Sequence, residues 1–270
     1  RMDRLTVAVL RCSIVTILLT FALAAAPSAA DDPAAASGPR ALYQAGDWLR
    51  AEQSAATASD AASKTLAAQA VLARLMAGEL ADEPRGDKRE AARRAQSHAR
   101  SALDMDPDHA PAHLRLAAGI GYEARYRSSL SAAMARLPQR GLSHIETALE
   151  LDPTDPWAHA MLGAWHLEVA RKGGEGMFGS DIETGLQAYR RAVAMDGVEP
   201  AIPYHFALAL IAAHPNAHGD EAEALLDQAL ASPAETAFDR AAHQLARNLK
   251  IALHADPATA QALAVERLER

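Results

Sequence analysis

Apolar and polar positions alternate along most of the chain with the spacing of an α-helix. Four segments carry a small or apolar residue, a second one four positions later, and an alanine three positions after that. This spacing places the three residues on one helical face, and the small outer members let a neighbouring helix approach closely. The four sets are Ala95, Ala99 and Ala102; Gly141, Ile145 and Ala148; Gly185, Tyr189 and Ala192; and Ala222, Leu226 and Ala229.

Proline and turn residues divide this pattern into helices. Pro107, Pro153 and Pro233 end them, because proline lacks the amide hydrogen and its ring clashes with the preceding turn. Asp155 and Pro156 supply an N-cap and a first-turn proline for a new helix. We expect no strand, and we expect helices near residues 40–58, 61–77, 88–104, 111–134, 139–151, 156–171, 181–195, 201–213, 219–231, 235–254 and 257–268.

The end of one such helix recurs further along the chain. The segment 102–107, followed by Ala112-His113, reappears at 148–153, followed by Ala158-His159. A looser third copy covers 192–196 and continues into Tyr204-His205. Such self-similarity predicts copies of one two-helix unit, stacked so that each unit buries the apolar side of the next.

These residues resemble the tetratricopeptide repeat family, which has Leu-Gly in its first helix and an Ala, large residue, Ala, Pro series in its second. Leu162-Gly163, Ile145, Ala148 and Pro153 carry the likeness best. It implies an all-α, right-handed superhelical solenoid of antiparallel helix pairs with C-terminal capping helices. The expected organisation is a leader at 1–30, an N-terminal segment and helix at 31–59, about four helix pairs at 60–233 and capping helices at 234–270.

Two middle repeats depart from the family pattern. The small residues of their paired helices, Ala117 with Gly141 and Gly163 with Gly185, lie 24 and 22 positions apart, where the family has about a dozen. Both repeats therefore carry an insertion at the same turn. Equivalent turns of a stacked solenoid share one edge, so we expect the two insertions to lie beside each other.

The first residues have the order of a secretory signal. Arg4 and Arg11 precede an apolar run from Cys12 to Ala26, which is shorter than the roughly 20 residues of a membrane-spanning helix. We expect cleavage after Ala30, a periplasmic or secreted protein, and no stable membrane insertion afterwards. Cys12 is the only cysteine, so the mature chain would have no thiol.

Composition supports a helical protein and argues against nucleic-acid binding. Hydrophobic residues make up 50% of the chain but aromatic residues only 4%, which favours helix-forming Ala and Leu over sheet formers. Beyond residue 30, 24 basic and 33 acidic residues give a net charge of about −9. Such a charge opposes association with nucleic acids and anionic lipid surfaces.

We expect no enzymatic activity, catalytic residue, metal or cofactor. The sequence offers no nucleophile with a positioned base and no nucleotide fingerprint. His113, His159 and His205 recur at equivalent positions, and packing explains them better than a metal, because stacked repeats hold equivalent residues too far apart for one ion.

The resemblance also implies an apolar binding groove along the concave face. Its lining suits an apolar helix or peptide segment of another envelope protein, or an apolar, lipid-like molecule, unless the chain's own terminal helices fill it. The groove residues are Pro111, Leu114, Tyr122, Trp157, Leu167, Phe206 and Leu210.

The two insertions provide a second candidate surface. Arg125 and Arg127 form a basic cluster in one, and Met177 and Phe178 are apolar residues of a glycine-rich loop in the other. Either they form the rim of a binding site, or the cluster is an ordinary solvated helix face. We therefore expect a non-catalytic scaffold or adaptor for protein partners, with a small-molecule binding protein of a transport system as the alternative.

Overall fold

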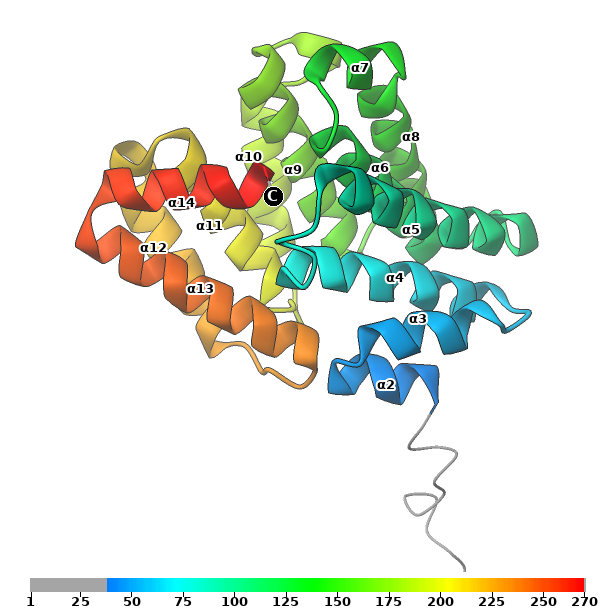
Figure 1. Cartoon of the computed structure of the whole chain (residues 1–270). Coiled ribbons are helices and arrows are strands. Elements are labelled where there is room, and N and C mark those ends of the chain that lie inside the picture. Colours follow the sequence, from blue (N-terminus) through cyan, green and yellow to red (C-terminus); the bar gives the residue numbers. More distant parts are fainter. Residues whose placement is uncertain (1–37, 270) are drawn as a thin grey trace, which may run out of the picture.

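The computed structural model describes residues 38–269, and this part of the chain is entirely helical, which confirms the all-α class (Figure 1). It contains thirteen α-helices and one short 3-10 helix, η2, and no strand. The helices are α2 (Pro39–Ala45), α3 (Trp48–Ala56), α4 (Ala61–Ala77), α5 (Arg85–Met105), α6 (Ala110–Arg125), α7 (Ser129–Met134), α8 (Leu137–Leu151), α9 (Pro156–Gly173), η2 (Met177–Gly179), α10 (Ile182–Val193), α11 (Ala201–Ala213), α12 (Pro215–Ala231), α13 (Ala237–Ala255) and α14 (Pro257–Glu269).

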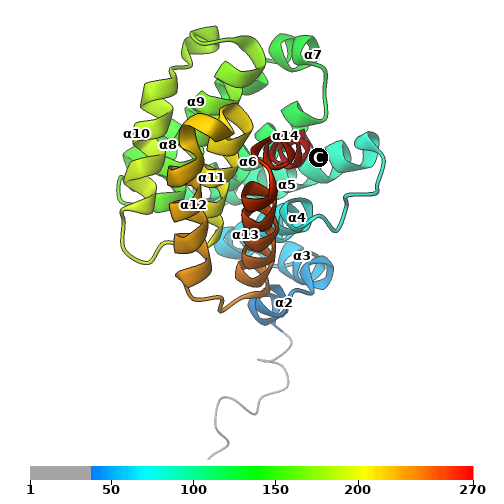
Figure 2. The ribbon, with the colours of Figure 1, turned by 90° about the vertical axis from the view of Figure 1, so that its left-hand side faces the viewer.

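Helices that follow one another in sequence pack against each other through most of the molecule. The strongest contacts join α4 to α5, α5 to α6, α6 to α8, α9 to α10 and α11 to α12. The row then closes on itself, because α13 packs against α2 and α4 while α14 lies against α11 (Figure 2). Helix α13 thus meets the first described helices, and the expected right-handed superhelical solenoid is not confirmed.

Helices α9 and α10 approach each other most closely at two glycines. A Cβ atom placed on Gly163 would lie 2.5 Å from a ring carbon of Tyr189 and 2.9 Å from the carbonyl oxygen of Gly185. A Cβ atom on Gly185 would lie 2.9 Å from the Cβ atom of His166. The small residues on these helical faces therefore set the distance between the helices, as their spacing in the sequence predicts.

Two expected helices are each divided in the structure. The segment 40–58 breaks at Gly46, whose left-handed backbone (φ 96°) ends α2, and the Asp47 carboxylate then accepts a hydrogen bond from the Arg50 amide at 3.3 Å to begin α3. The segment 111–134 breaks after Arg125, and α7 begins at the Ser128 cap. Helical periodicity continues across both breaks, so only the local turn geometry reveals them.

The largest apolar cluster joins α9 to α14. Its centre contains Tyr189 and Phe206, whose rings stack 4.7 Å apart with an angle of 4° between their planes. A second cluster joins α2, α3 and α4, and Ala237 and Phe238 at the start of α13 pack against it. The terminal helices therefore contribute to two cores and connect the two ends of the described chain.

A helix that spans a lipid bilayer is both long and continuously apolar. Within residues 38–269, no helix combines the length and the apolar character that crossing a lipid bilayer requires. The expected leader at 1–30 lies outside the described residues.

Replacing Gly163 by alanine should destabilise the protein by about 1–3 kcal/mol, because the added methyl group overpacks the contact with Tyr189. The matched control is Gly121→Ala in α6, where an added Cβ atom meets nothing within 4 Å. That control should be neutral or more stable by about 0.5–1 kcal/mol. Urea unfolding followed by circular dichroism measures both changes, and equal stabilities would contradict the role of the glycine contact.

Candidate functional site

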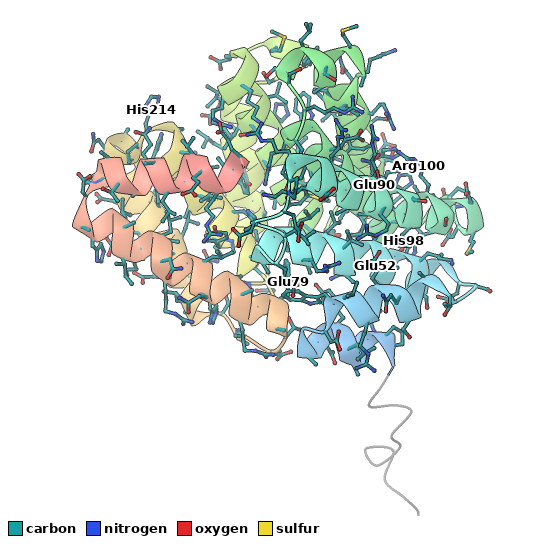
Figure 3. The ribbon with its side chains drawn as sticks, in the orientation of Figure 1. Glu52, Glu79, Glu90, His98, Arg100 and His214 are labelled. Carbon is teal, nitrogen blue, oxygen red and sulfur yellow. The ribbon has the colours of Figure 1, made fainter. Side chains whose placement is uncertain are left out.

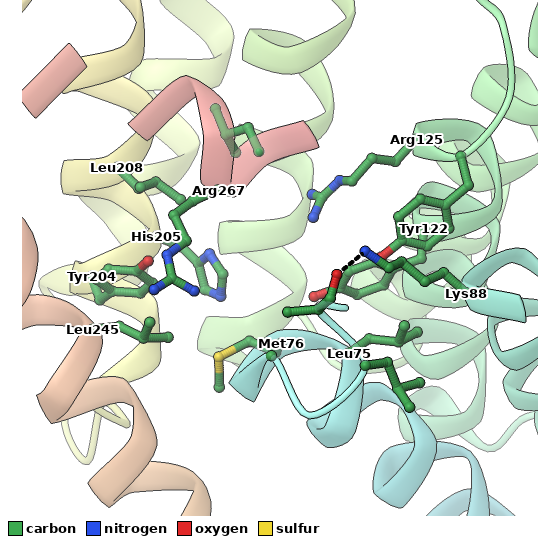
Figure 4. Close-up of a pocket in the computed structure, with 15 residues that line it drawn as sticks. Leu75, Met76, Lys88, Tyr122, Arg125, Tyr204, His205, Leu208, Leu245 and Arg267 are labelled. Atoms are coloured by element: carbon green, nitrogen blue, oxygen red, sulfur yellow. Dashed lines mark hydrogen bonds between the residues drawn. The ribbon is translucent and has the colours of Figure 1, made fainter. Parts of the chain in front are cut away.

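A small cavity with both apolar and cationic side chains in its lining lies where the last turn of α14 meets α4, α6 and α11 (Figure 4). Its volume is about 40 Å³, which is enough for a few water molecules or one small ion. The lining residues are Leu75, Met76, Gly78, Leu80, Ala81, Lys88, Tyr122, Arg125, Tyr126, Tyr204, His205, Leu208, Leu245, Arg267 and Leu268.

The placement of α14 brings one of these side chains, Arg267, to the cavity. The Asp256 carboxylate accepts a hydrogen bond from the Thr259 amide at 2.8 Å and so caps the start of the helix. Ala260 and Ala264, four positions apart, are fully buried in the core that includes α11. Because this face of α14 is fixed against the core, Arg267 near the end of the helix is directed toward the cavity.

Three tyrosines and one histidine give the cavity its uncharged polar groups. Burial raises the pKa of Tyr122, Tyr126 and Tyr204, so their hydroxyl groups stay protonated and can donate hydrogen bonds. Burial and the nearby charge of Arg125 lower the pKa of His205 to about 4. His205 is therefore neutral at pH 7.

Three cations line the same cavity, and none of its lining residues is acidic. Lys88 donates a hydrogen bond from Nζ to the carbonyl oxygen of Ala81 at 2.6 Å. The guanidinium carbon of Arg125 lies 4.7 Å from the ring centre of Tyr122, a cation–π contact. With Arg267, these side chains make the cavity positive although the protein as a whole is negative.

The expected groove residues mostly lie in the core rather than on an open face. Leu114, Phe206 and Leu210 are at most 1% exposed, and Leu167 packs against the largest apolar cluster. The ring of Trp157 lies 6.4 Å from that of Phe238 on α13. Of the remaining two, Tyr122 lines the cavity and Pro111 is exposed on the first turn of α6. Of these residues, Trp157 contacts α13, and Leu167, Phe206 and Leu210 share a cluster with α13 and α14, whereas Leu114 is buried among α6, α8 and α9.

The four expected insertion residues do not form one cluster. Met177 and Phe178 are 42% and 36% exposed on η2, whereas Arg125 faces the cavity. Arg127 is fixed by an ion pair, with its guanidinium nitrogen 2.7 Å from Oε1 of Glu123. The two insertions themselves, α7 and η2, lie at the same end of the molecule in both views (Figures 1 and 2).

Glu123 lies at the centre of a buried ionic cluster. Burial alone would raise its pKa, but hydrogen bonds from Gln96, Arg127 and Arg93 outweigh burial and lower the pKa to about 2. Such a group is a fixed anion that joins α5 to α6. The i,i+4 spacing of Glu123 and Arg127 is the sequence signal that could have revealed this pair.

A second buried carboxylate, Glu52, joins α3 to α5. Oε1 of Glu52 lies 2.6 Å from Nε of Arg94 and 3.3 Å from Nε2 of His98 (Figure 3). Burial would raise the pKa of Glu52, but the hydrogen bonds from His98 and Arg94 lower it. Both buried carboxylates are thus held ionised by cationic partners, which is the state of a structural ion pair rather than of a general acid.

Two of the recurring histidines form hydrogen bonds to the turns that connect neighbouring helices. Nε2 of His113 lies 2.9 Å from the carbonyl oxygen of Pro107, and Nε2 of His159 lies 2.9 Å from that of Pro153. Because a carbonyl oxygen only accepts, each Nε2 donates. His205 has no such bond in the described structure, and its copy of the repeat has Gly197 where the others have proline. It lines the cavity instead.

His113 also pairs with a further histidine. Its Nδ1 atom lies 3.0 Å from Nδ1 of His144. Since Nε2 of His113 carries the ring proton, its Nδ1 accepts and Nδ1 of His144 donates. Burial, together with the charges of His113, Arg140 and Arg100, lowers the pKa of His144 to about 4. His144 is therefore neutral at pH 7.

Comparison with known proteins corrects the resemblance inferred from the sequence. A family model described as Regulator of microtubule dynamics protein 1-3 matches residues 41–253. No tetratricopeptide repeat family matches, so the expected membership of that family is wrong. Small residues at four- and three-residue spacing are required wherever helices pack closely, and the spacing therefore does not identify one family. No curated protein matches the chain.

Stability should fall as the pH is lowered from about 6.5 to about 4, because the unfolded chain binds a proton on His144 that the folded protein excludes (folded pKa about 4, ordinary value 6.5). His205 acts in the same direction. His144→Gln should remove up to ~1.4 kcal/mol per pH unit of this slope. Urea unfolding at pH 7, 6 and 5 measures it, and an unchanged slope would disprove the assignment.

Proposed function

The chain belongs to the family described as Regulator of microtubule dynamics protein 1-3, and from this membership we propose that it is a non-catalytic protein that acts by binding another protein. The family description refers to regulation of a protein assembly. From this description we transfer only one property to the chain, namely that it acts on a protein partner. The matched residues, 41–253, include both insertions.

The observation that carries this proposal is a group of exposed apolar side chains on the two insertions. We call Leu130, Met134, Met177 and Phe178 the insertion edge. Their exposed fractions are 72%, 78%, 42% and 36%. Large apolar side chains that gather on surface segments at one end of a molecule favour a protein-binding surface over an ordinary solvated face.

Backbone conformation supports the same surface. Within residues 38–269, two non-glycine residues have a left-handed backbone, Arg136 with φ 53° and Phe178 with φ 54°. One lies in each insertion. The left-handed conformation costs roughly 1–2 kcal/mol for a residue with a side chain, and such strain is found preferentially at functional sites. At Phe178 it occurs in a residue of the insertion edge itself.

The proposed occupant is a protein rather than an apolar small molecule. The cavity between α14 and α6 has a volume of about 40 Å³, and Lys88, Arg125 and Arg267 line it. An apolar ligand would bury these charges without a counterion, at a high cost in free energy. The insertion edge, by contrast, offers apolar side chains without enclosing a ligand-sized space.

We place this activity in the periplasm, with an envelope protein as the partner, on the basis of the leader expected at 1–30. In cells that express the full chain, the mature protein should begin at Asp31, because cleavage is expected after Ala30. Mass spectrometry of the protein from the periplasmic fraction measures its amino terminus. An intact amino terminus with cytosolic recovery would contradict this location.

A double substitution, Met134→Asp with Phe178→Asp, should reduce capture of the partner by about tenfold or more, because it places charge on an apolar contact surface. Helicity should not change, since both side chains are exposed. Tagged mature protein is used to capture partners from the native envelope, and each captured protein is quantified by mass spectrometry.

The matched control for this experiment is Ile251→Asp, at an apolar residue of α13 that is 68% exposed. A partner that the double variant loses and the control retains supports the insertion edge. If every protein captured by the wild type is captured equally by the double variant, the proposed surface is wrong.

A further inference from the structure

We propose that the cavity between α14, α6 and α11 binds a single small oxyanion, a phosphate or carboxylate group. The proposal concerns a site separate from the insertion edge and does not depend on the proposed protein partner. It rests on the unpaired charges, the hydrogen-bond donors and the size of the cavity.

The first observation is that two arginines face each other across the cavity without a counterion. Arg125 comes from the end of α6 and Arg267 from the last turn of α14 (Figure 4). Within residues 38–269, neither makes an ion pair. Three other partly buried arginines, Arg74, Arg127 and Arg171, each lie within 4 Å of a carboxylate, at 3.0, 2.7 and 2.8 Å, whereas Arg115 makes no ion pair among the described residues. Cations removed from water require a counterion or strong acceptors.

No neighbouring carboxylate satisfies this pair. Glu168 is close enough for the charge of Arg125 to act on it, but its carboxylate is already held by Arg171 at 2.8 Å and by Lys172 at 3.0 Å. The ring of Tyr122 partly compensates Arg125 through the cation–π contact at 4.7 Å. Arg267 has no comparable partner among the described residues. The missing acceptor is therefore one that a ligand would supply.

The remaining polar groups suit an oxyanion as well. The hydroxyl groups of Tyr122, Tyr126 and Tyr204 remain protonated and so can donate. His205 is neutral and can donate through one ring nitrogen. Guanidinium and hydroxyl donors that converge without an acidic residue among them select an acceptor with a negative charge.

The volume of the cavity limits the size of the ligand that it can bind. About 40 Å³ accommodates one oxyanion group and not an organic molecule. The cavity shares Lys88 and Tyr126 with an outer pocket of about 230 Å³, which Arg85, Glu266 and Glu269 also line. An oxyanion between Arg125 and Arg267 would also hold α14 against α6.

The experiment titrates inorganic phosphate into the mature protein by calorimetry, with chloride keeping the ionic strength constant. We expect one phosphate per chain. Arg267→Gln should weaken binding about 10- to 100-fold, because it removes a charge-assisted interaction. The matched control, Arg191→Gln, removes an exposed arginine on α10 with the same loss of charge and should bind as the wild type does.

A second measurement does not depend on how well a variant folds. In the wild-type protein, phosphate should shift the ring resonances of His205 and leave those of His159 unchanged, because only His205 lines the cavity. Equal binding by wild type and Arg267→Gln, or a His205 that neither phosphate nor acetate shifts, would overturn the proposal. Acetate in place of phosphate distinguishes the two oxyanion geometries: binding of either that is lost in Arg267→Gln supports the site, and binding of neither overturns it.

Discussion

The distance between neighbouring helices is the constraint on which the rest of this structure depends. At α9 and α10 that distance is set by Gly163 and Gly185, and neither position has room for a methyl group without movement of its neighbours. Fully buried alanines have the same function on α5 and α12. The Tyr189 ring, which contacts Gly163 on one side, stacks on Phe206 of α11, and that stack lies in the core on which α14 packs.

The packing of α13 and α14 on the earlier helices determines what kind of binding site the protein has. If the helix pairs ended in an open face, Phe206 and Leu210 would line an apolar groove. With α13 and α14 packed on that face, they are core residues, and the space that remains is small and positively charged. The surface that we propose for a protein partner is instead at the end of the molecule that carries α7 and η2, where the insertions keep apolar side chains in solvent.

The sequence predicts the helices well, since each depends on local periodicity and on stop signals such as Pro107 and Pro153. Gly46-Asp47 resembles a turn between two helices, yet the apolar pattern continues through it, so periodicity alone predicts one helix there. The packing of α13 on α2 is not visible, because no local pattern encodes contacts between distant segments. The residues of the candidate site also differ in whether the sequence could reveal them. His205 differs from its two counterparts in lacking the nearby proline, which is a visible signal. Arg267 lies in a helix with no repeat motif, so only the folded structure shows where it points.

The seam between α2 and α13 connects residues that are far apart in the chain. A Cβ atom on Gly46 would lie only 2.8 Å from the Cβ atom of Ala237, so the two segments meet with almost no intervening space. Contacts of such long sequence separation form late, after the loop between them has closed. During synthesis, the apolar cluster of α2, α3 and α4 therefore stays uncovered until α13 has been made. Over that interval the cluster is exposed to solvent, and the exposure ends when the first turns of α13 pack on it.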